Sequence, residues 1–444
     1  RRKILFTIAI LAIFRLGSVI PTPNVNIVNV NACRLDATTG SNAGLYSMIN
    51  LFSGGALLQL AIFALGIMPY ITASIIVQLL TVVIPRFEEL RKEGQAGQAK
   101  MTQYTRYLTV ALALLQATGI VALAANGNLL QGQANCDAQN IIRDQSILGL
   151  SIIVIVMVAG AMVVMWFGEL ITERGIGNGM SLLISAGIVA RIPAEGRMIL
   201  NDRGAVAFSL VLVAGIIIVG GVVFIESGQR RIPVQYAKRM VGRKMYGGSS
   251  TYLPLKVNQA GVIPVIFALS LLTIPHVITQ LVQMGKTEPG NGWWEKFVAA
   301  HLTNPADPTY IAIYFGMIIF FTYFYVSITF NPDERADEMK KFGGFIPGIR
   351  PGKPTADYLR YVLSRITLPG SIYLGVIAVL PNLFLEMGNS GGVQNLPFGG
   401  TAVLIMIGVG LDTVKQIESQ LVMRHYDGFM DRGKKSAGRP RVVR

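Results

Sequence analysis

The chain has 444 residues, of which 52% are hydrophobic and only 14% are charged. Its mean hydropathy of +0.51 excludes an ordinary soluble domain, in which about a quarter of the residues carry charge. The formal charge of +15 does not by itself indicate nucleic-acid binding, because cytoplasmic loops of membrane proteins carry an excess of Lys and Arg. The composition predicts a polytopic membrane protein.

Ten apolar windows follow one another along the chain, separated by charged residues or by Gly/Pro-rich loops. Most have the roughly 17 to 26 residues that a helix needs to cross a bilayer. The fifth window is the shortest. The ten windows are 4–20, 59–84, 104–125, 147–171, 180–192, 205–225, 258–284, 310–330, 366–387 and 399–423.

The basic residues between these windows decide the number of spans. With ten spans, thirty Lys and Arg residues fall on the side that holds both chain ends, and six fall on the opposite side. This asymmetry is what the positive-inside rule requires of ten helices with both termini in the cytoplasm. Nine helices would place the second half of the chain the wrong way round.

The stretch from Gly44 to Pro85 is too long for a single membrane helix. Its first part, Leu45 to Leu58, is too short to span a hydrocarbon core of about 30 Å, and Ser53-Gly54-Gly55 interrupts it. In its second part, Pro69 is expected to kink a spanning helix near the centre. A short uncharged segment before a span indicates a re-entrant piece, which is tolerated only inside protein or along a water-filled cavity. We therefore expect a pore with a segment folded into it.

Ten spans divide into two groups of five, so a second copy of five helices would run in inverted orientation. The second window carries Gly66-Ile67-Met68-Pro69-Tyr70-Ile71, and the seventh carries Gly261-Val262-Ile263-Pro264-Val265-Ile266. Both segments fit the pattern G-x-x-P-x-I at the same ordinal place in each half. Gly and Pro interruptions at corresponding positions of two halves indicate where the functional site lies.

Features that could carry chemistry have simpler explanations. The histidines, His276, His301 and His425, show no metal-ligand spacing, so no metal and no cofactor are expected. The GxSG segment 388–391 resembles the motif of intramembrane serine proteases, but it falls in a glycine-rich external loop without a histidine at matching depth. The glycines of 175–179 predict a tight turn between two helices.

Charges inside the windows are few: Arg15, Glu169, Asp412, Lys415 and Glu418. The last three can pair along one helical face near the cytoplasmic end. A coupled solute transporter would need carboxylates near the middle of the membrane. A secondary transporter with inverted repeats is nevertheless the alternative reading, because broken helices in inverted halves describe that class too.

Two long basic loops are expected on the cytoplasmic side, 226–257 and 331–365, each with seven Lys and Arg residues. The positive-inside rule explains their sign but not their length, since a plain connection needs only a few residues. Such loops can bind a phosphate backbone or an acidic protein.

Eight segments, taken in order, are similar to signature segments of the SecY/Sec61-alpha family, and in particular to its bacterial SecY members. They run from the end of the re-entrant stretch to the last span, and the resemblance as a whole covers nearly the whole chain. The segments are FSGGAL, IFALGIMPYITASIIVQLL, KEGQAGQAKMTQYTRY, GELITERGIGNGMS, LPLKVNQAGVIPVIFA, FNPDERADEMKK, FIPGIRPGKPT and LPFGGT.

The resemblance implies an all-α polytopic membrane protein with ten transmembrane helices in two inverted five-helix halves around a central pore. Its expected parts are an N-terminal half 1–190 with a re-entrant plug half-helix at 45–58, a hinge loop 191–204, a C-terminal half 205–424 with the two basic loops, and a cytoplasmic tail 425–444. The pore would open sideways between helices two and three on one side and seven and eight on the other.

The resemblance also implies functional residues. The pore ring falls on Ile67, Ile71, Met180, Ile184, Ile266 and Ile405, where Met180 departs from the isoleucine that is usual in the family. The plug residues are Met48, Phe52, Ser53, Gly54 and Gly55. The loop-tip residues that contact cytoplasmic partners are Arg243, Lys244 and Arg350.

The function implied is a protein-conducting channel of the bacterial plasma membrane, with both termini cytoplasmic. It would translocate unfolded preproteins that bear signal sequences and release hydrophobic segments into membrane lipid. The channel would not be an enzyme, so energy would come from the SecA motor ATPase, the ribosome or the proton motive force. SecE and SecG subunits would complete the complex.

Overall fold

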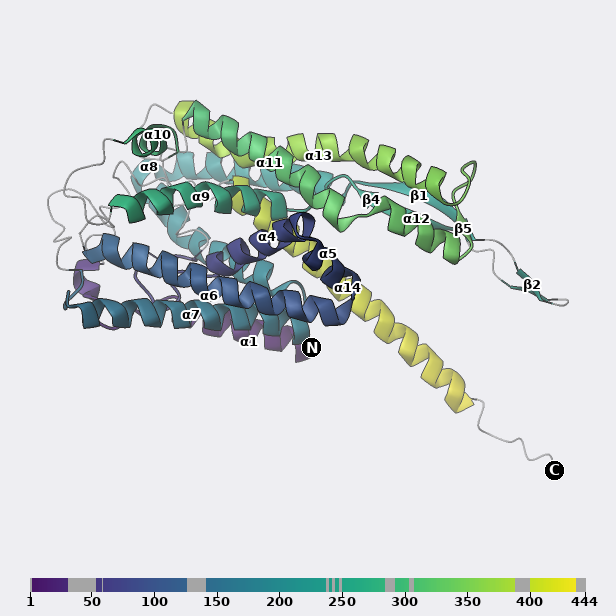
Figure 1. The fold of residues 1–444 in the computed structure, drawn as a ribbon, viewed down its shortest axis with the longest axis horizontal. Coiled ribbons are helices and arrows are strands. Elements are labelled where there is room, and N and C mark those ends of the chain that lie inside the picture. The colour runs from purple at the N-terminus through teal and green to yellow at the C-terminus, as the bar shows by residue number, and fades with distance from the viewer. Residues whose placement is uncertain are drawn as a thin grey trace.

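The computed structural model describes residues 2–30, 53–57, 59–125, 141–236, 239–241, 244–246, 250–283, 292–302, 307–387 and 400–436. Within these residues the molecule is built mainly from helices that run along its long axis (Figure 1). The helices are α1 (Arg2–Gly17), α4 (Met68–Val83), α5 (Pro85–Lys92), α6 (Gln95–Ala125), α7 (Ile147–Arg174), α8 (Gly179–Ser227), α9 (Ile263–Gln283), α10 (Trp293–His301), α11 (Pro308–Thr329), α12 (Pro332–Lys341), α13 (Lys353–Met387) and α14 (Gly400–Ser436).

Several of these helices are long and apolar enough to cross a membrane. In the described part of the chain there are five, at Gln95–Ala125, Ile147–Arg174, Gly204–Ser227, Pro308–Lys341 and Lys353–Leu380. The bent pair formed by α4 and α5 makes a sixth when it is counted as one span. Shorter apolar helices begin at Gly179 and Ile263. The protein is therefore a multi-pass membrane protein, and the total of ten spans stays a prediction.

Pro69 does not kink a long helix, so that prediction was wrong. Residues 59–67 form turns that are interrupted by a β-bridge between Ala61 and Pro21, and α4 begins at Met68 with Pro69 in its first turn. A proline is tolerated there because the first N–H groups of a helix have no acceptor in any case. Gly66 precedes the helix with a φ of 54°, a conformation that favours glycine. The backbone therefore stays irregular up to Gly66 and becomes helical immediately after it.

The second copy of the motif adopts the same local structure. Gly261 has a φ of 63°, α9 begins two residues later at Ile263, and Pro264 lies in its first turn. Figure 1 shows α4 and α5 near the middle of the molecule and α9 running toward the end that is opposite the strands. The shared pattern G-x-x-P-x-I therefore encodes the same irregular approach and helix start in both segments.

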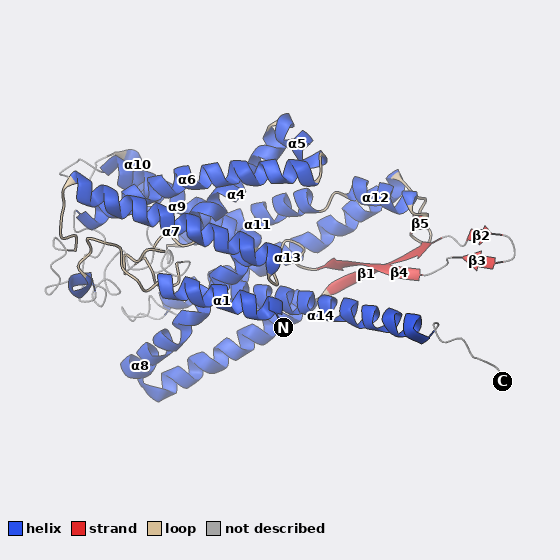
Figure 2. Cartoon of the chain, turned by 90° about the horizontal axis from the view of Figure 1, so that it is seen from below, coloured by secondary structure: helices blue, strands red, loops and turns tan. Residues whose placement is uncertain are grey.

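The segment 191–204, expected to be a loop, is helical. Helix α8 continues from Gly179 through Pro193 to Ser227, and the break is confined to Gly204, whose φ is 79° and ψ is 176°. Figure 2 shows the two arms of α8 meeting at a sharp corner. The hinge role predicted for this segment is not tested, but any bending would be concentrated at one glycine.

The basic loop 226–257 contains β-structure that an all-α prediction missed. Strand β1 (Gln229–Tyr236) pairs antiparallel with β4 (Ser250–Lys256) and with β5 (Gly344–Phe345), while β2 (Arg239–Val241) and β3 (Lys244–Tyr246) form a small hairpin. The strands extend from one end of the molecule, opposite α10 (Figure 2). Ile232 and Val234 are buried and alternate with exposed residues, as expected for a strand with one covered face.

The helices are held together by three apolar clusters. The central cluster contains buried residues of α1, α4, α7, α8, α9, α11, α13 and α14. A second cluster joins the turns at 57–65 to α6 and α7, and a third packs the sheet against α11 and α13. Lipid tails are as apolar as these side chains, so close van der Waals packing, and not the exclusion of water, holds such helices together. The central cluster is where helices of the two halves make this packing with each other.

Polar contacts connect the ends of these helices. The predicted tight turn at 175–179 is confirmed: Asn178 caps α8 by accepting from the N–H groups of Met180 and Ser181, and the Gly177 N–H donates to Gln416 of α14 at 2.8 Å. The carboxylate of Asp412 lies 3.1 Å from Nζ of Lys256 in β4. The tenth window is therefore tied to the sheet and to the α7–α8 turn.

Candidate functional site: an aliphatic waist

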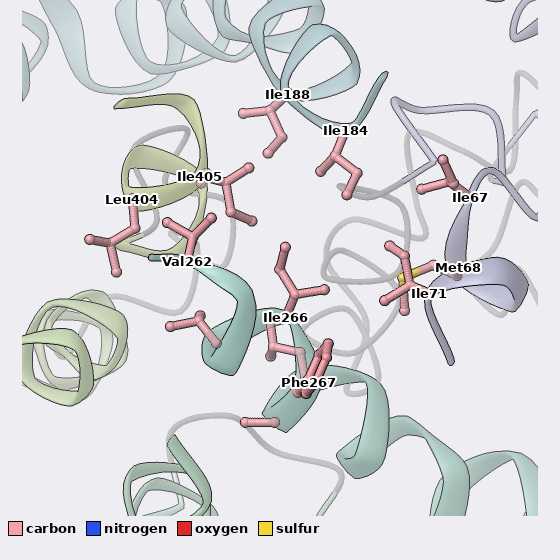
Figure 3. Packing of buried hydrophobic residues seen from close by; sticks show 14 of the residues in the cluster. Ile67, Met68, Ile71, Ile184, Ile188, Val262, Ile266, Phe267, Leu404 and Ile405 are labelled. Carbon is pink, nitrogen blue, oxygen red and sulfur yellow. The ribbon is translucent and has the colours of Figure 1, made fainter. Parts of the chain in front are cut away.

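The isoleucines predicted to form a ring lie in the central cluster. Ile67 caps the start of α4 and Ile71 lies one turn later, while Ile184, Ile266 and Ile405 come from α8, α9 and α14. All five are at most 8% exposed. Figure 3 shows Ile71, Ile184, Ile266 and Ile405 pointing toward one another from these elements. The structure brings the five side chains together, and their role as a ring stays a prediction.

Met180 is placed differently from these five residues. It is partly buried and packs against the central cluster. A Cβ atom added to Gly168 of α7 would lie only 2.1 Å from Sδ of Met180, so the thioether occupies the space that this glycine leaves open. The sulfur of Met180 therefore packs against α7. A flexible side chain suits such a gap.

Two further residues belong to the waist that the sequence analysis did not name. Val262 and Ile188 are buried in the same cluster and lie beside the predicted residues in Figure 3. The internal repeat could have identified Val262, because it holds the position in G-x-x-P-x-I that Ile67 holds. Helical spacing could have identified Ile188, which follows Ile184 by four residues.

The chemistry of this waist is that of saturated hydrocarbon. Aliphatic side chains offer no hydrogen bond to water or to an ion, so a narrow passage that they line closes by dewetting. Within the described residues, no group of three or more His, Cys, Asp and Glu side chains could hold a metal ion. The arrangement is suited to sealing and to contact with apolar or flexible chains.

The root of the re-entrant stretch is a tight turn beside this waist. Ser53, Gly54 and Gly55 form it, with Gly54 and Gly55 at φ values of 65° and 94°. Oγ of Ser53 accepts from the N–H of Leu57 at 3.1 Å. Met48 and Phe52, the other predicted plug residues, lie outside the described residues. The described part of the predicted plug is thus its attachment to the body of the protein.

In the second half, a buried polar contact occupies the corresponding approach to α9. Nδ2 of Asn258 donates to Oε1 of Glu226 at 2.5 Å and to the carbonyl of Gly261 at 3.0 Å. Both side chains are buried. The amide therefore supports the positive-φ glycine and joins it to the end of α8, which stabilises the irregular segment before the helix.

The predicted docking residues lie at the end that carries the sheet. Lys244 begins β3 and pairs in register with Val241. Arg350 is exposed in the turn between β5 and α13, and its carbonyl accepts from Oγ1 of Thr355 at 2.8 Å. Arg243 lies outside the described residues. Lys244 and Arg350 thus belong to the projecting part of the molecule rather than to the helical body.

Two arginines make contacts between helices near this end. Arg106 of α6 binds both carboxylate oxygens of Glu169 in α7, at 3.0 and 2.6 Å. Nη2 of Arg91 in α5 donates to the carbonyl of Ile328 in the last turn of α11. The carbonyls in the last turn of a helix accept no hydrogen bond from within the helix, so this carbonyl can accept one from Arg91. The Arg91 contact is made between the two halves.

Comparison with known proteins agrees with this architecture. The SecY family model matches residues 61–414. The protein translocase subunit SecY of Mycobacterium tuberculosis is 74% identical over 430 residues, covering 97% of both chains. The corresponding subunit of Corynebacterium glutamicum is 60% identical over 431 residues, again with 97% of both chains covered.

Solved structures share the fold at low sequence identity. A protein-conducting channel superimposes with a TM-score of 0.65 at 19% identity, covering 95% of this chain and 92% of the other. Sec61 from a canine ribosome-channel complex gives 0.62 at 18% identity, with the same coverage. A third similar structure is a SecY whose plug domain stabilises the closed channel, with a TM-score of 0.64. The chain belongs to the SecY family.

Proposed function

We propose that this protein is the channel-forming subunit of a bacterial protein translocase. It passes unfolded secretory polypeptides across the plasma membrane and releases hydrophobic segments sideways into lipid. The observation that carries the proposal is the aliphatic waist, where α4, α8, α9 and α14 bring buried isoleucines together at the centre of a SecY-family chain. No chemical step at this site is required.

The waist explains how one passage can seal and conduct. In the resting state, Ile67, Ile71, Ile184, Ile266 and Ile405 form a ring that excludes water and ions. Aliphatic side chains change rotamer without losing a specific partner, so the same ring can surround a polypeptide of any sequence. Met180 contributes from its position against α7, and the segment 45–58 blocks the external side as a plug.

A lateral exit explains the release of hydrophobic segments. In the described residues α4 and α6 contact α9, and Arg91 of α5 contacts the end of α11. Separation of α4 and α6 from α9 and α11 would expose the passage to lipid. A segment of about twenty apolar residues then leaves the passage, because burial of each CH₂ group gains about 0.8 kcal/mol. A polar segment stays in the passage and crosses the membrane.

Translocation is driven by partners at the cytoplasmic end. We assign docking of the SecA motor ATPase and of the ribosome to the two basic loops, through Arg243, Lys244 and Arg350. A Sec61 structure in a ribosome-bound complex has the same fold. SecE and SecG complete the membrane complex, and both chain ends lie in the cytoplasm with the sheet. The 191–204 segment, with its break at Gly204, is the hinge between the halves.

The proposal is tested by reconstituting the protein with SecE and SecA in lipid vesicles. A secretory precursor should become protected from external protease only when ATP is present. A matched precursor without a signal sequence serves as the control. Vesicles that contain the assembled complex but never protect the precursor would contradict the proposal, and coupled uptake of a small solute would favour a transporter instead.

A further inference from the structure

The short helix α10 lies across the long axis of the molecule. It follows α9 and precedes the spanning helix α11, at the end that is opposite the strands (Figure 2). Figure 1 shows α10 nearly end-on, while α9 and α11 run across the picture. Because α11 crosses the bilayer, a short helix perpendicular to it at this end of the molecule lies in the plane of the membrane surface.

One side of α10 packs against the protein. Val298 and Leu302, which directly follows the helix, are buried in the central cluster. Nε1 of Trp294 donates to Oγ1 of Thr279 in α9 at 3.1 Å, and that hydroxyl donates to the carbonyl of Pro275 at 2.9 Å. Trp294, Val298 and Leu302 are four residues apart, so they lie on the same side of the helix. This side fixes α10 to α9.

An aromatic stripe runs beside the packed side. Its members are Trp293, Phe297 and His301, which are also four residues apart. The ring centroids of Trp293 and Phe297 are 5.9 Å apart, and those of Phe297 and His301 are 5.3 Å apart. Phe297 packs partly against the central cluster, whereas Trp293 is 77% exposed. Lys296 is exposed and lies beyond Trp293, on the side away from the packed residues.

This order of side chains around α10 fits the boundary between lipid and water. The indole ring of Trp is apolar with one polar N–H, and such rings gather at membrane–water interfaces. Water alone would leave the exposed ring of Trp293 unfavourably hydrated, while the hydrocarbon core would be costly for Lys296. A helix that carries an apolar stripe and a basic residue beside it is typical of helices that lie in the interface.

Contacts at both ends make α10 a rigid connection between two long helices. At its start, Trp294 binds α9, the helix that carries Ile266 of the waist. At its end, Nδ1 of His301 lies 3.3 Å from Oδ2 of Asp307. Asp307 caps α11 by accepting from the N–H of Thr309 at 2.8 Å. The depth of α10 in the membrane therefore determines the depth of these ends of α9 and α11.

We propose that α10 is an interfacial anchor whose aromatic stripe binds the boundary between phospholipid headgroups and acyl chains. Its partner is the phospholipid surface at the end of the molecule opposite the strands, which is the external surface in the orientation proposed above. Binding there holds the ends of α9 and α11 at a fixed level while their other parts pack in the central cluster. The inference needs only the multi-pass architecture and goes beyond the proposed function.

The first test measures the depth of Trp293 by fluorescence quenching in phospholipid vesicles that contain the protein assembled with its partner subunits. Subtracting the emission of the Trp293→Phe complex removes the signals of the other two tryptophans of the chain, Trp166 and Trp294, and of the partners. Lipids brominated close to the headgroup should quench the Trp293 signal about twofold more strongly than lipids brominated near the chain ends.

Trp166 is the matched control for depth. It is exposed on the spanning helix α7, and its signal is obtained in the same way with Trp166→Phe. Deeply brominated lipid should quench it more strongly than shallow lipid. For Trp293, strong quenching by iodide in the water without quenching by either lipid would contradict the anchor. Protection from lipid and iodide alike would show that another protein covers the stripe, which would also overturn the proposal.

A second test compares the stripe with the polar side of the same helix. In a chain with Cys33 and Cys136 replaced by serine, spin labels are attached at Trp293→Cys or Lys296→Cys. The label at position 293 should collide more often with oxygen, which concentrates in the bilayer. The label at position 296 should collide more often with a nickel chelate, which stays in water. Equal or reversed preferences at the two positions would contradict the assigned orientation.

Neither test depends on transport, so the anchor and the proposed function can fail separately. A complex that never protects a secretory precursor but gives the expected depths would remove the proposed function alone. A complex that transports the precursor while Trp293 is quenched only from the water would remove the anchor alone.

Discussion

The starts of α4 and α9 have the same local structure but connect to different parts of the molecule. Each helix begins two residues after a glycine with positive φ, carries a proline in its first turn, and presents an isoleucine to the central cluster. Before α4 lies the root of the re-entrant stretch, which Arg15 holds. Before α9 lies strand β4, and the segment that joins them contains Asn258, which donates to Glu226 of α8.

The difference shows how a repeated element can serve two tasks. The repeat contributes two sides of the waist, because both copies place aliphatic residues at the same place relative to a helix start. The segment upstream of each copy decides what is attached to the waist. In the first half this is the proposed plug, and in the second half it is the sheet proposed to receive cytoplasmic partners.

The largest loss of stability should come from shortening the isoleucine that each copy of the repeat contributes to the waist. Ile71 and Ile266 are similarly buried, at 8% and 6% exposure, so Ile71→Ala and Ile266→Ala should each lower the free energy of unfolding by about 3 kcal/mol. Thermal unfolding of the purified complex measures both. Val82→Ala, on an exposed face of α4, is the control and should change little. If only one of the two variants loses stability, the two copies of the repeat do not contribute equally to the waist.

The ion pairs of the two halves should differ in strength. The side chain of Glu169 is only 21% exposed, and Arg106 binds it through two hydrogen bonds. Arg106→Gln removes this bidentate partner and should lower the free energy of unfolding by about 1.5 kcal/mol. Lys256→Gln breaks an exposed pair with Asp412 and should cost at most about 1 kcal/mol. Double-mutant cycles at low and high salt measure both. An equal and salt-insensitive coupling would contradict this ranking.

The glycines that begin the two motifs should respond alike to substitution. Gly66→Ala and Gly261→Ala force a Cβ into a positive-φ conformation, which costs about 1 kcal/mol at each site. A Cβ on Gly261 would meet open space, so its cost comes from the backbone alone. Gly119→Ala is the control: it lies inside α6, also in open space, and should be stabilising. Unfolding midpoints that rise in all three variants would contradict the assigned backbone conformations.

The smallest effect concerns the predicted external ends of the two halves at low pH. The pKa of Asp307, the N-cap of α11, is lowered mainly by the N–H of Thr309 and also by His301. A lowered pKa means that the carboxylate stabilises the folded state above its unfolded pKa of about 4, and that this contribution is lost as pH falls through the folded value. In the first half, Arg15 contacts the carbonyl of Gly54. Asp307→Asn should therefore remove part of the acid sensitivity of the unfolding midpoint, and an unchanged acid profile would contradict this.

The residues of the waist were predicted from the resemblance to the SecY/Sec61-alpha family, and the internal repeat supports only some of them. The isoleucine of the pattern G-x-x-P-x-I is Ile71 in the first copy and Ile266 in the second, and the structure places both in the central cluster. Val262 follows the glycine of the second copy as Ile67 follows the glycine of the first, but the pattern leaves this position open, so Val262 was not predicted. The kink at Pro69 was wrong because a proline in an apolar window looks the same inside a helix and at its first turn, and only the φ of Gly66 distinguishes the two cases.

Other features depended on contacts that a single segment does not reveal. The alternation of Ile232 and Val234 with polar residues indicates a strand, but it does not reveal the partners, which are Leu253 opposite Ile232 in β4 and Gly344 opposite Tyr236 in β5. The predicted pairing within 412–418 did not account for Lys256, which lies beside Asp412 only after β4 is in place. The hinge segment has the composition of a loop, yet it continues α8 as helix up to Gly204.

The central claim, that a polypeptide passes through the aliphatic waist, is tested most directly by site-specific cross-linking. In a chain with Cys33 and Cys136 replaced by serine, single cysteines are placed by Ile184→Cys, Ile266→Cys and, as a lipid-facing control on α8, Ile216→Cys. A secretory precursor with one cysteine is then stalled during transport. We expect disulfide bonds at positions 184 and 266 and none at 216. A protease-protected precursor that bonds to neither waist position would contradict the account.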